Sequence, residues 1–476
     1  MSLTRMYQGV VLCFAALFFT GCAATQNKHD LAAFNQDLKI GQYQQALDFA
    51  KKSGDFDKEG KTDDLLWALQ AANISSLIEN YPESNTIYDQ AEEFMKDEDL
   101  ESLPKEGFEK MGALLVNNSV NDYEQTVFDS VMVNTYKGLN NIFLQDWQNA
   151  RIEFNRAADR QRRAKEHFAK KIAAQEKEIK EQKQKKTEKS LTVNYDDSRK
   201  TINKNFVEMD KWKSYGDYIN PYTDYLHGLY FMLAATQGNK ASDYEKAVYS
   251  FKRVYGTAGK NSVIANDLAM ARNLQSGKWK RDNIRPQVWV IFENGLAPTL
   301  DQIIIPIPLF VVTKEISYVQ LALPKIVEEQ KAYDKLDIFD SGKKLGSTTQ
   351  IASIDRIVKA EFKKEYPFKV TEAILQAVIK GSLQYVAQDQ LDLIGALGGA
   401  LYQAATTHAD TRSWSALPKE VQALRLRKPD SGKITLTGSG MLEPVEVTLP
   451  ATRYSIVHVC AAGSPSQPIV RVVGFN

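Results

Sequence analysis

The chain has 476 residues, with 60 Lys and Arg against 59 Asp and Glu and a net charge of +1. This balance argues against nucleic acid as a partner, because proteins that bind the phosphate backbone carry an excess of basic residues. The length allows two or three domains with large hydrophobic cores.

A signal peptide and a candidate lipidation site begin the chain. An apolar run at 10–19 is too short to span a bilayer as a permanent helix. It ends in Phe19-Thr20-Gly21-Cys22, which resembles the bacterial lipobox, where the cysteine receives lipid and becomes the mature N-terminus. We therefore expect a signal peptide over 1–21 and lipid on Cys22, at the periplasmic face of the outer membrane because Ala23 rather than aspartate follows. The alternative is an ordinary signal peptide that leaves a soluble periplasmic protein.

Cysteine usage agrees with this address. Cys13 lies in the predicted signal peptide and Cys22 is the predicted lipid acceptor, so Cys460 remains alone. No disulfide can then form within the mature chain. Cys460 lies in an apolar strand sequence, IVHVC, which predicts a buried and unreactive thiol.

From about residue 29 to 277 the pattern is helical and repetitive. The clearest unit covers 134–158, with Gly138 on a first helix and small or aromatic residues on a second, namely Trp147, Ala150, Phe154 and Ala157. Small residues allow two helices to approach closely and aromatic residues fill the remaining space, as in tetratricopeptide repeats. Partial matches near Gly41, Ser84 and Gly228 predict an α-helical repeat domain over 22–280. A generic helical bundle is the alternative.

A charged segment interrupts the repeats. Residues 159–189 contain twelve Lys and Arg against six Asp and Glu, and neither Gly nor Pro. Helix-forming residues and favourable i,i+4 pairs predict a helical arm over about 159–195 that extends the repeat before it. One interpretation is a solvated arm, and the other is a basic arm that contacts anionic lipid headgroups or an acidic partner.

Strand patterns replace helical ones after Gly277. Short β-rich segments bounded by turn residues predict strands at 287–292, 316–323, 335–339, 433–437, 445–449, 454–460 and 469–473. A helical section at about 353–407 separates the two groups of strands. We expect a C-terminal α+β domain over 286–476, built as a small sandwich or a mixed sheet.

Two apolar segments in this domain are candidates for interaction. The run 303–312 cannot form a regular helix, because Pro306 and Pro308 lack donors and fix φ. It is predicted either to pack in an extended, buried form or to form an exposed patch facing a partner or a membrane. In 395–400, Gly395 and Gly399 would lie on one helix face, which favours close helix packing.

Catalytic motifs are weak or absent in the sequence. The segment 256–261 is similar to the end of a phosphate-binding loop, but Val254 occupies the place of the first glycine. The five histidines lack metal-ligand spacing, and no Gly-x-Ser-x-Gly motif occurs. We therefore expect no catalytic residue, metal or cofactor, although a pair of carboxylates for glycan cleavage has no distinctive spacing.

The complete pattern resembles a group of bacterial tetratricopeptide-type outer-membrane lipoproteins with an appended C-terminal α+β domain. The resemblance rests on the lipobox, the repeats and the segments 292–298 and 410–414. More distantly, the chain is similar to outer-membrane lipoproteins that combine helical repeats with another domain to support envelope assembly or to activate peptidoglycan synthases. The resemblance implies a lipid-anchored protein whose partners are periplasmic or outer-membrane proteins.

Three functions follow as hypotheses. The first is a scaffold that binds partners in the concave groove formed by the first helices of the repeats. Uncharged polar residues on those helices are the candidate contacts, namely Asn73, Asn140, Asn141, Tyr222 and Tyr225. The alternative for these five is that they cap and pack the helices. The second function is a structural subunit of an outer-membrane or secretion machine, and the third is a glycan-active enzyme.

Overall fold

The computed structural model describes residues 26–101, 123–184, 202–204, 206, 209, 211–216, 219–238, 241–259, 261–310, 316–370, 373–374, 408–464 and 466–476. The predicted signal peptide, Cys22 and the segment 395–400 lie outside the described residues. Within those residues, no helix combines the length and the apolar character needed to cross a membrane.

Helices form the described chain up to residue 275. They are a helix over 26–39, α2 (Tyr43–Ser53), α3 (Leu65–Leu77), α4 (Tyr81–Glu101), α6 (Val127–Phe143), α7 (Trp147–Gln184), α9 (Pro221–Gly238), α10 (Ala241–Ala258) and α11 (Ser262–Gln275), followed by the short helix η3 (Arg281–Asn283). Side-chain caps fix several starts. Asp64 accepts a hydrogen bond from the Trp67 amide before α3, and Asn261, in the segment similar to a phosphate-binding loop, caps α11.

Successive helices pack as pairs, with the same turn in three of them. Gly41, Glu79 and Gln145 all adopt positive φ, and each donates its amide to the carbonyl three residues back. The next residue in each case donates to the carbonyl five residues back and begins the second helix. Four residues further on lies a fully buried small residue, namely Ala46, Ser84 or Ala150.

Glycines bring the later pairs into close contact. A Cβ atom on Gly138 of α6 would lie 3.0 Å from the ring of Phe154 on α7, and one on Gly228 of α9 would lie 3.1 Å from the ring of Phe251 on α10. The predicted use of glycine and phenylalanine at these crossings is therefore confirmed.

Strands follow from residue 287. They are β1 (Gln287–Asn294), β2 (Thr299–Phe310), β3 (Ile316–Val327), β4 (Leu336–Asp340), β5 (Lys343–Ser347), β6 (Thr349–Ser353), β7 (Glu420–Arg427), β8 (Lys433–Gly438), β9 (Val445–Thr448), β10 (Tyr454–Ala461) and β11 (Ile469–Phe475). Each predicted strand is present, and β2, β5, β6 and β7 are additional. The chain is thus a mixed α+β protein, with helices first and strands second. Of the predicted helical section, 354–370 and 373–374 are helical, and 375–407 lies outside the described residues.

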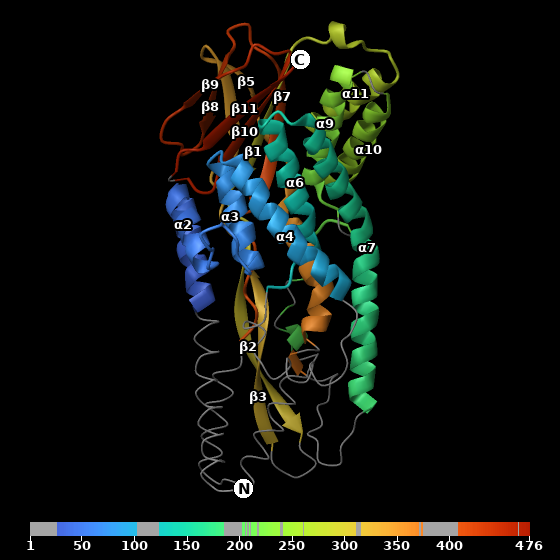
Figure 1. The fold of residues 1–476 in the computed structure, drawn as a ribbon, viewed down its shortest axis with the longest axis vertical. Coiled ribbons are helices and arrows are strands. Elements are labelled where there is room, and N and C mark those ends of the chain that lie inside the picture. Colours follow the sequence, from blue (N-terminus) through green and yellow to red (C-terminus); the bar gives the residue numbers. More distant parts are fainter. Residues whose placement is uncertain are drawn as a thin grey trace.

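The strands form three sheets. A central sheet has the order β11-β10-β1-β7-β6, with β1 and β10 parallel, and an outer sheet has the order β5-β4-β8-β9. Side chains of β1 alternate between two cores, because Trp289 and Ile291 pack with the helices whereas Val288 and Val290 pack with the outer sheet. The body therefore has three layers: helices, central sheet and outer sheet (Figure 1).

One continuous core joins the helical and strand regions. Leu69 of α3, Tyr136 of α6 and Leu229 of α9 belong to the same hydrophobic cluster as Trp289 of β1 and Ile456 of β10. The central sheet thus lies against the first helices of the pairs. The predicted ranges 22–280 and 286–476 mark a change of secondary structure and share this core.

The third sheet is the β2–β3 hairpin, which extends from one end of the body together with the distal half of α7 (Figure 1). The hairpin and the helix over 354–370 form a second core that includes Ile305, Leu321, Leu323, Phe362 and Tyr366. The extended form predicted for 303–312 is confirmed as far as Phe310. Ile305 is buried, whereas Ile304 is 47% exposed, so each alternative for this segment holds for one face of the strand.

Ala150→Trp tests the close helix crossing. Ala150 is fully buried between paired helices, so the larger side chain should lower the free energy of unfolding by about 1–3 kcal/mol through overpacking. Ile152→Trp, two residues along the same helix at a half-exposed position, is the matched control and should change stability by less than about 0.5 kcal/mol. Urea unfolding measures both, and equal losses would contradict the packing described.

Candidate functional site

The structure places the five predicted groove residues inside the protein. Asn73, Asn140, Asn141, Tyr222 and Tyr225 are all buried, because neighbouring helices and the central sheet cover the faces that carry them. The prediction of an open groove is therefore wrong for this chain. Their contacts agree with the alternative that they pack the helices. For example, Asn140 donates to Ser84 Oγ at 2.9 Å, and Tyr225 Oη donates to Asp267 at 2.8 Å.

A buried polar cluster lies where the helices meet the central sheet. It consists of Glu293 on β1, His458 and Cys460 on β10, and Arg471 on β11. Register brings them together, because Glu293 pairs with Cys460 across the parallel ladder and His458 pairs with Arg471 across the antiparallel one. We call these four residues the interface cluster.

Hydrogen bonds connect the interface cluster to the helices. Glu293 Oε1 accepts from Tyr222 Oη at 2.5 Å and from Tyr136 Oη at 3.2 Å. Arg471 Nη1 donates to the carbonyl oxygen of Ser76 on α3 at 2.7 Å. Three helix pairs are thus joined to one sheet through two charged side chains.

The protonation of His458 follows from its partners. Arg471 Nη2 lies 2.9 Å from His458 Nδ1, and because a guanidinium can only donate, Nδ1 accepts and the proton resides on Nε2. Nε2 faces Glu293 Oε1 at 3.4 Å. Burial lowers the pKa of His458, which keeps the ring neutral.

Glu293 remains ionised despite its complete burial. Burial alone would raise its pKa, but the contacts with His458 and Tyr222 and the positive charge of Arg471 outweigh burial and lower the pKa of this carboxyl. For Cys460 the balance is reversed, because burial and the nearby carboxylate raise the pKa of its thiol. The prediction of a buried cysteine is confirmed, and a raised pKa is the opposite of what a nucleophilic thiol requires.

The interface cluster also has the composition of a metal site. Ligand atoms of Glu293, His458 and Cys460 lie within 4.8 Å of one another, and carboxylate, imidazole and thiolate groups are zinc ligands. However, Arg471 occupies the Nδ1 lone pair of His458, and tyrosine hydroxyls occupy an oxygen of Glu293. The guanidinium also supplies the positive charge that a cation would bring. We therefore interpret this cluster as a structural network.

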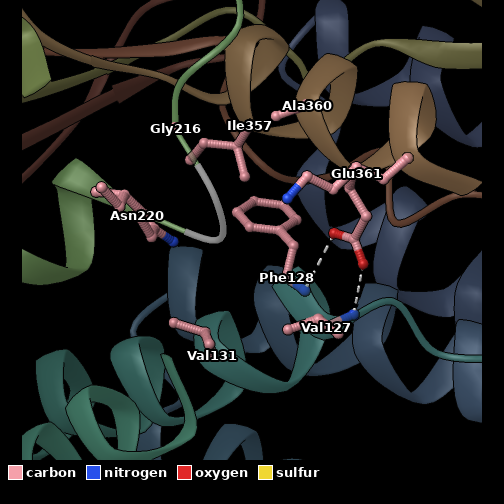
Figure 2. Close-up of a pocket in the computed structure, with 10 residues that line it drawn as sticks. Val127, Phe128, Val131, Gly216, Asn220, Ile357, Ala360 and Glu361 are labelled. Carbon is pink, nitrogen blue, oxygen red and sulfur yellow. Dashed lines mark hydrogen bonds between the residues drawn. The ribbon is translucent and has the colours of Figure 1, made fainter. Parts of the chain in front are cut away.

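A pocket lies at the other end of the helix layer, between α6, the helix over 354–370 and the residues Gly216, Ile219 and Asn220. It encloses about 400 Å³, including space open to solvent, and its walls are mainly apolar. Figure 2 shows the ring of Phe128 at its centre, with Ile357 and Ala360 on one side and Val131 on the other. Glu361 is the carboxylate among the lining residues.

Glu361 binds the start of α6. Its two carboxylate oxygens accept from the Val127 amide at 2.8 Å and the Phe128 amide at 3.4 Å, as Figure 2 shows. These amides belong to the first turn of the helix, where backbone donors lack intrahelical partners. Burial, together with the charges of Glu365 and Asp129, nevertheless raises the pKa of Glu361 to about 8. The pocket therefore contains a carboxyl group whose charge is sensitive to pH near neutrality.

Sequence reasoning missed both groups of residues. The interface cluster was marked only by polar residues that interrupt apolar strands, at Glu293, His458 and Arg471. Their register, which the sequence does not specify, was needed to bring them together. Glu361 carried no signal, because its role depends on a contact 234 residues away in the chain.

No protein-family model, curated protein or solved structure matches this chain. The function must therefore be inferred from the geometry of its own residues.

Substitutions at the interface cluster should show strong coupling. Arg471→Met leaves the Glu293 carboxylate buried without its nearby positive charge, and should lower the free energy of unfolding by about 3–5 kcal/mol. The double variant with Glu293→Gln removes both charges and should lose less than the sum of the single losses. Urea unfolding of the four proteins in this cycle measures the difference, and additive losses would contradict an interaction across the interface.

The pH dependence of stability should report on Glu361. A carboxyl group with a raised folded pKa binds its proton more tightly in the folded state, so its contribution is present below the unfolded pKa near 4.5 and lost as pH rises towards 8. In the Glu361→Gln variant, the fall in the free energy of unfolding over this pH range should be smaller than in the wild type by up to about 5 kcal/mol. The measurement is the free energy of unfolding from pH 4.5 to 8.5.

Glu446→Gln, at an exposed strand position, is the matched control for this slope. Parallel curves for the wild type and Glu361→Gln would show that the carboxyl group does not titrate in this range.

Proposed function

We propose that this protein is a lipid-anchored scaffold at the periplasmic face of the outer membrane, which binds partner proteins of the cell envelope through tetratricopeptide-type helical repeats. The observation that carries the proposal is the turn repeated in three successive helix pairs. Gly41, Glu79 and Gln145 occupy equivalent positions, with the same two backbone hydrogen bonds at each. A turn of this kind is common at helix ends, and it also follows α2 at Asp55. What supports stacked repeats is that in all three pairs the second helix starts directly after the turn and places a buried small residue, Ala46, Ser84 or Ala150, at the same position.

The binding surface in this proposal is the outer face of the helix layer. The inner face is filled by the central sheet, so a partner must use another surface. Large apolar side chains are exposed on the second helices of neighbouring pairs, namely Ile152 on α7, at 45%, and Tyr249 on α10, at 62%. These two helices are joined by a paired contact of Arg151 with Asp243, at 2.8 and 2.5 Å. Exposed aromatic residues beside ordered charges suit a protein interface.

One observation favours a second candidate, a structural subunit of an envelope machine. The β2–β3 hairpin extends beyond the layered body, and Ile304 on it is 47% exposed. A protruding apolar hairpin is unusual for a protein that acts alone. The glycan-active alternative receives less support, since it needs two facing carboxylates and the pocket offers Glu361, which is already bound to α6.

The scaffold proposal is tested by affinity purification from membranes with the anchor intact. Ile152→Glu combined with Tyr249→Glu should reduce recovery of co-purifying proteins by at least about fivefold, because it places charge in the proposed interface. Leu442→Glu, at a 71% exposed position between β8 and β9, should leave recovery unchanged. Cys22→Ala should move the protein from the membrane to the soluble fraction. Undiminished recovery, or continued membrane attachment, would contradict the corresponding half of the proposal.

A further inference from the structure

The described chain begins beside the protruding hairpin. Lys28 Nζ lies 2.6 Å from Asp301 Oδ1 at the start of β2, and this contact lowers the pKa of the Asp301 carboxyl. As an exposed ion pair it contributes little stability, but it fixes where the N-terminal chain leaves the body. Figure 1 shows the helix over 26–39 starting at the same end from which the hairpin and the distal half of α7 extend.

The hairpin reaches at least as far as a lipid on Cys22 can. From Asp301 to Phe310, β2 advances nine residues, or about 30 Å at about 3.4 Å per residue. Cys22 precedes Lys28 by six residues, so even a fully extended chain places it no more than about 22 Å away. A membrane that holds this lipid therefore lies within reach of the distal hairpin.

One face of the hairpin is exposed in part, because Gln302 and Pro324 on it are covered whereas the residues further along are not. Ile305, Leu321 and Leu323 pack on the helix over 354–370, whereas Ile304, Pro306 and Gln320 are exposed on the other face. Apolar residues exposed on one face of a sheet indicate that another surface contacts that face.

Proline positions argue against another β-strand as that contact. Residue pairs along the antiparallel β2–β3 ladder alternate between hydrogen-bonded and non-hydrogen-bonded pairs. All three prolines of the hairpin, Pro306, Pro308 and Pro324, lie in pairs of the same kind. Because proline has no amide hydrogen and the ladder is continuous, all three nitrogens point away from the hairpin, towards its outer edges. The outer edge of β2 thus lacks two donors and that of β3 lacks one, which disfavours pairing of a further strand with β2 in particular.

Basic charge lies at the same end. Residues 165–184 of α7 contain six Lys against four Glu, and this part of the helix extends from the same end of the body as the hairpin (Figure 1). Anionic phospholipid surfaces attract such segments within a Debye length. The hairpin presents apolar residues and the arm carries basic ones. This combination of apolar and basic surface is typical of elements that bind a bilayer interface.

We propose that the β2–β3 hairpin and the distal half of α7 form a second membrane contact, in which they touch the anionic phospholipid surface that holds the Cys22 lipid. This inference rests on the proposed lipid anchor. It orients the molecule, with the hairpin towards the lipid and the β8–β9 turn away from it. The outer faces of α7 and α10 then remain free for protein partners.

Site-directed fluorescence tests the contact. The full-length lipoprotein is placed in vesicles of phosphatidylethanolamine and phosphatidylglycerol, with an environment-sensitive fluorophore on Ile304→Cys, Tyr318→Cys or Leu442→Cys. Cys460 is buried and Cys22 carries the lipid, so the introduced thiol is the one labelled. The Tyr318→Cys label should shift to shorter wavelength and be quenched by spin-labelled lipid, and the Ile304→Cys label should respond less because it is nearer the body. The label on Leu442→Cys should not respond.

Charge is tested by reversing three lysines on the arm. Lys170→Glu, Lys177→Glu and Lys180→Glu together should abolish quenching of the Tyr318→Cys label, whereas arginine at the same positions should preserve it. Thermal unfolding confirms that each variant is folded.

The outcomes separate the two proposals. A protein that is acylated on Cys22 and bound to vesicles, but whose Tyr318→Cys and Ile304→Cys labels behave like the Leu442→Cys label, would overturn the second contact and leave the anchor intact. Absence of lipid on Cys22 would overturn the anchor and the reach argument with it. Quenching that is graded along the hairpin and lost on charge reversal supports both.

Discussion

The buried charge pair of Glu293 and Arg471 is the constraint on which the arrangement of helices and strands depends. Both side chains lie in the apolar layer between α-helices and central sheet, where an isolated charge would cost several kcal/mol. Each is satisfied only if the layers meet in one register, with Tyr222 opposite β1 and the Ser76 carbonyl opposite β11. A shift by one residue would leave both unpaired. Apolar residues in their place would hold the layers together without selecting one alignment.

This constraint changes what the helix pairs can do. Stacked helix pairs need something to cover the inner faces of their first helices, and in this chain the central sheet covers them. The strands therefore occupy the position that a bound partner would take in an open repeat array. Buried polar side chains of the first helices are satisfied within the chain, as Asn140 is by Ser84 and Tyr225 by Asp267. Recognition of other molecules must then use the outer helix faces or the protruding end.

Local elements could be predicted from the sequence, whereas their assembly could not. Helix pairs and most strands follow from periodicity and from the spacing of residues such as Gly138 and Phe154, which act over short distances in the chain. Strand β2 was predicted to be extended because of its prolines, but its partner β3 sets the parity that makes those prolines compatible with a ladder. The filled groove was missed because it depends on contacts between Tyr222 and Glu293, 71 residues apart. The polar residues on the first helices do lie at an interface, but the surface that they contact belongs to the same chain.

The same logic connects the pocket to the protruding end. Glu361 belongs to the helix over 354–370, whose opposite side supports the hairpin through Phe362 and Tyr366. Its carboxylate binds the first turn of α6, so the helix that carries the hairpin is attached to the helix layer through a group whose pKa is raised to about 8. Deprotonation strengthens the hydrogen bonds to the α6 amides but adds a negative charge near the carboxyl groups of Asp129 and Glu365. These opposing effects meet at the junction between body and hairpin, so the stability of that junction depends on pH.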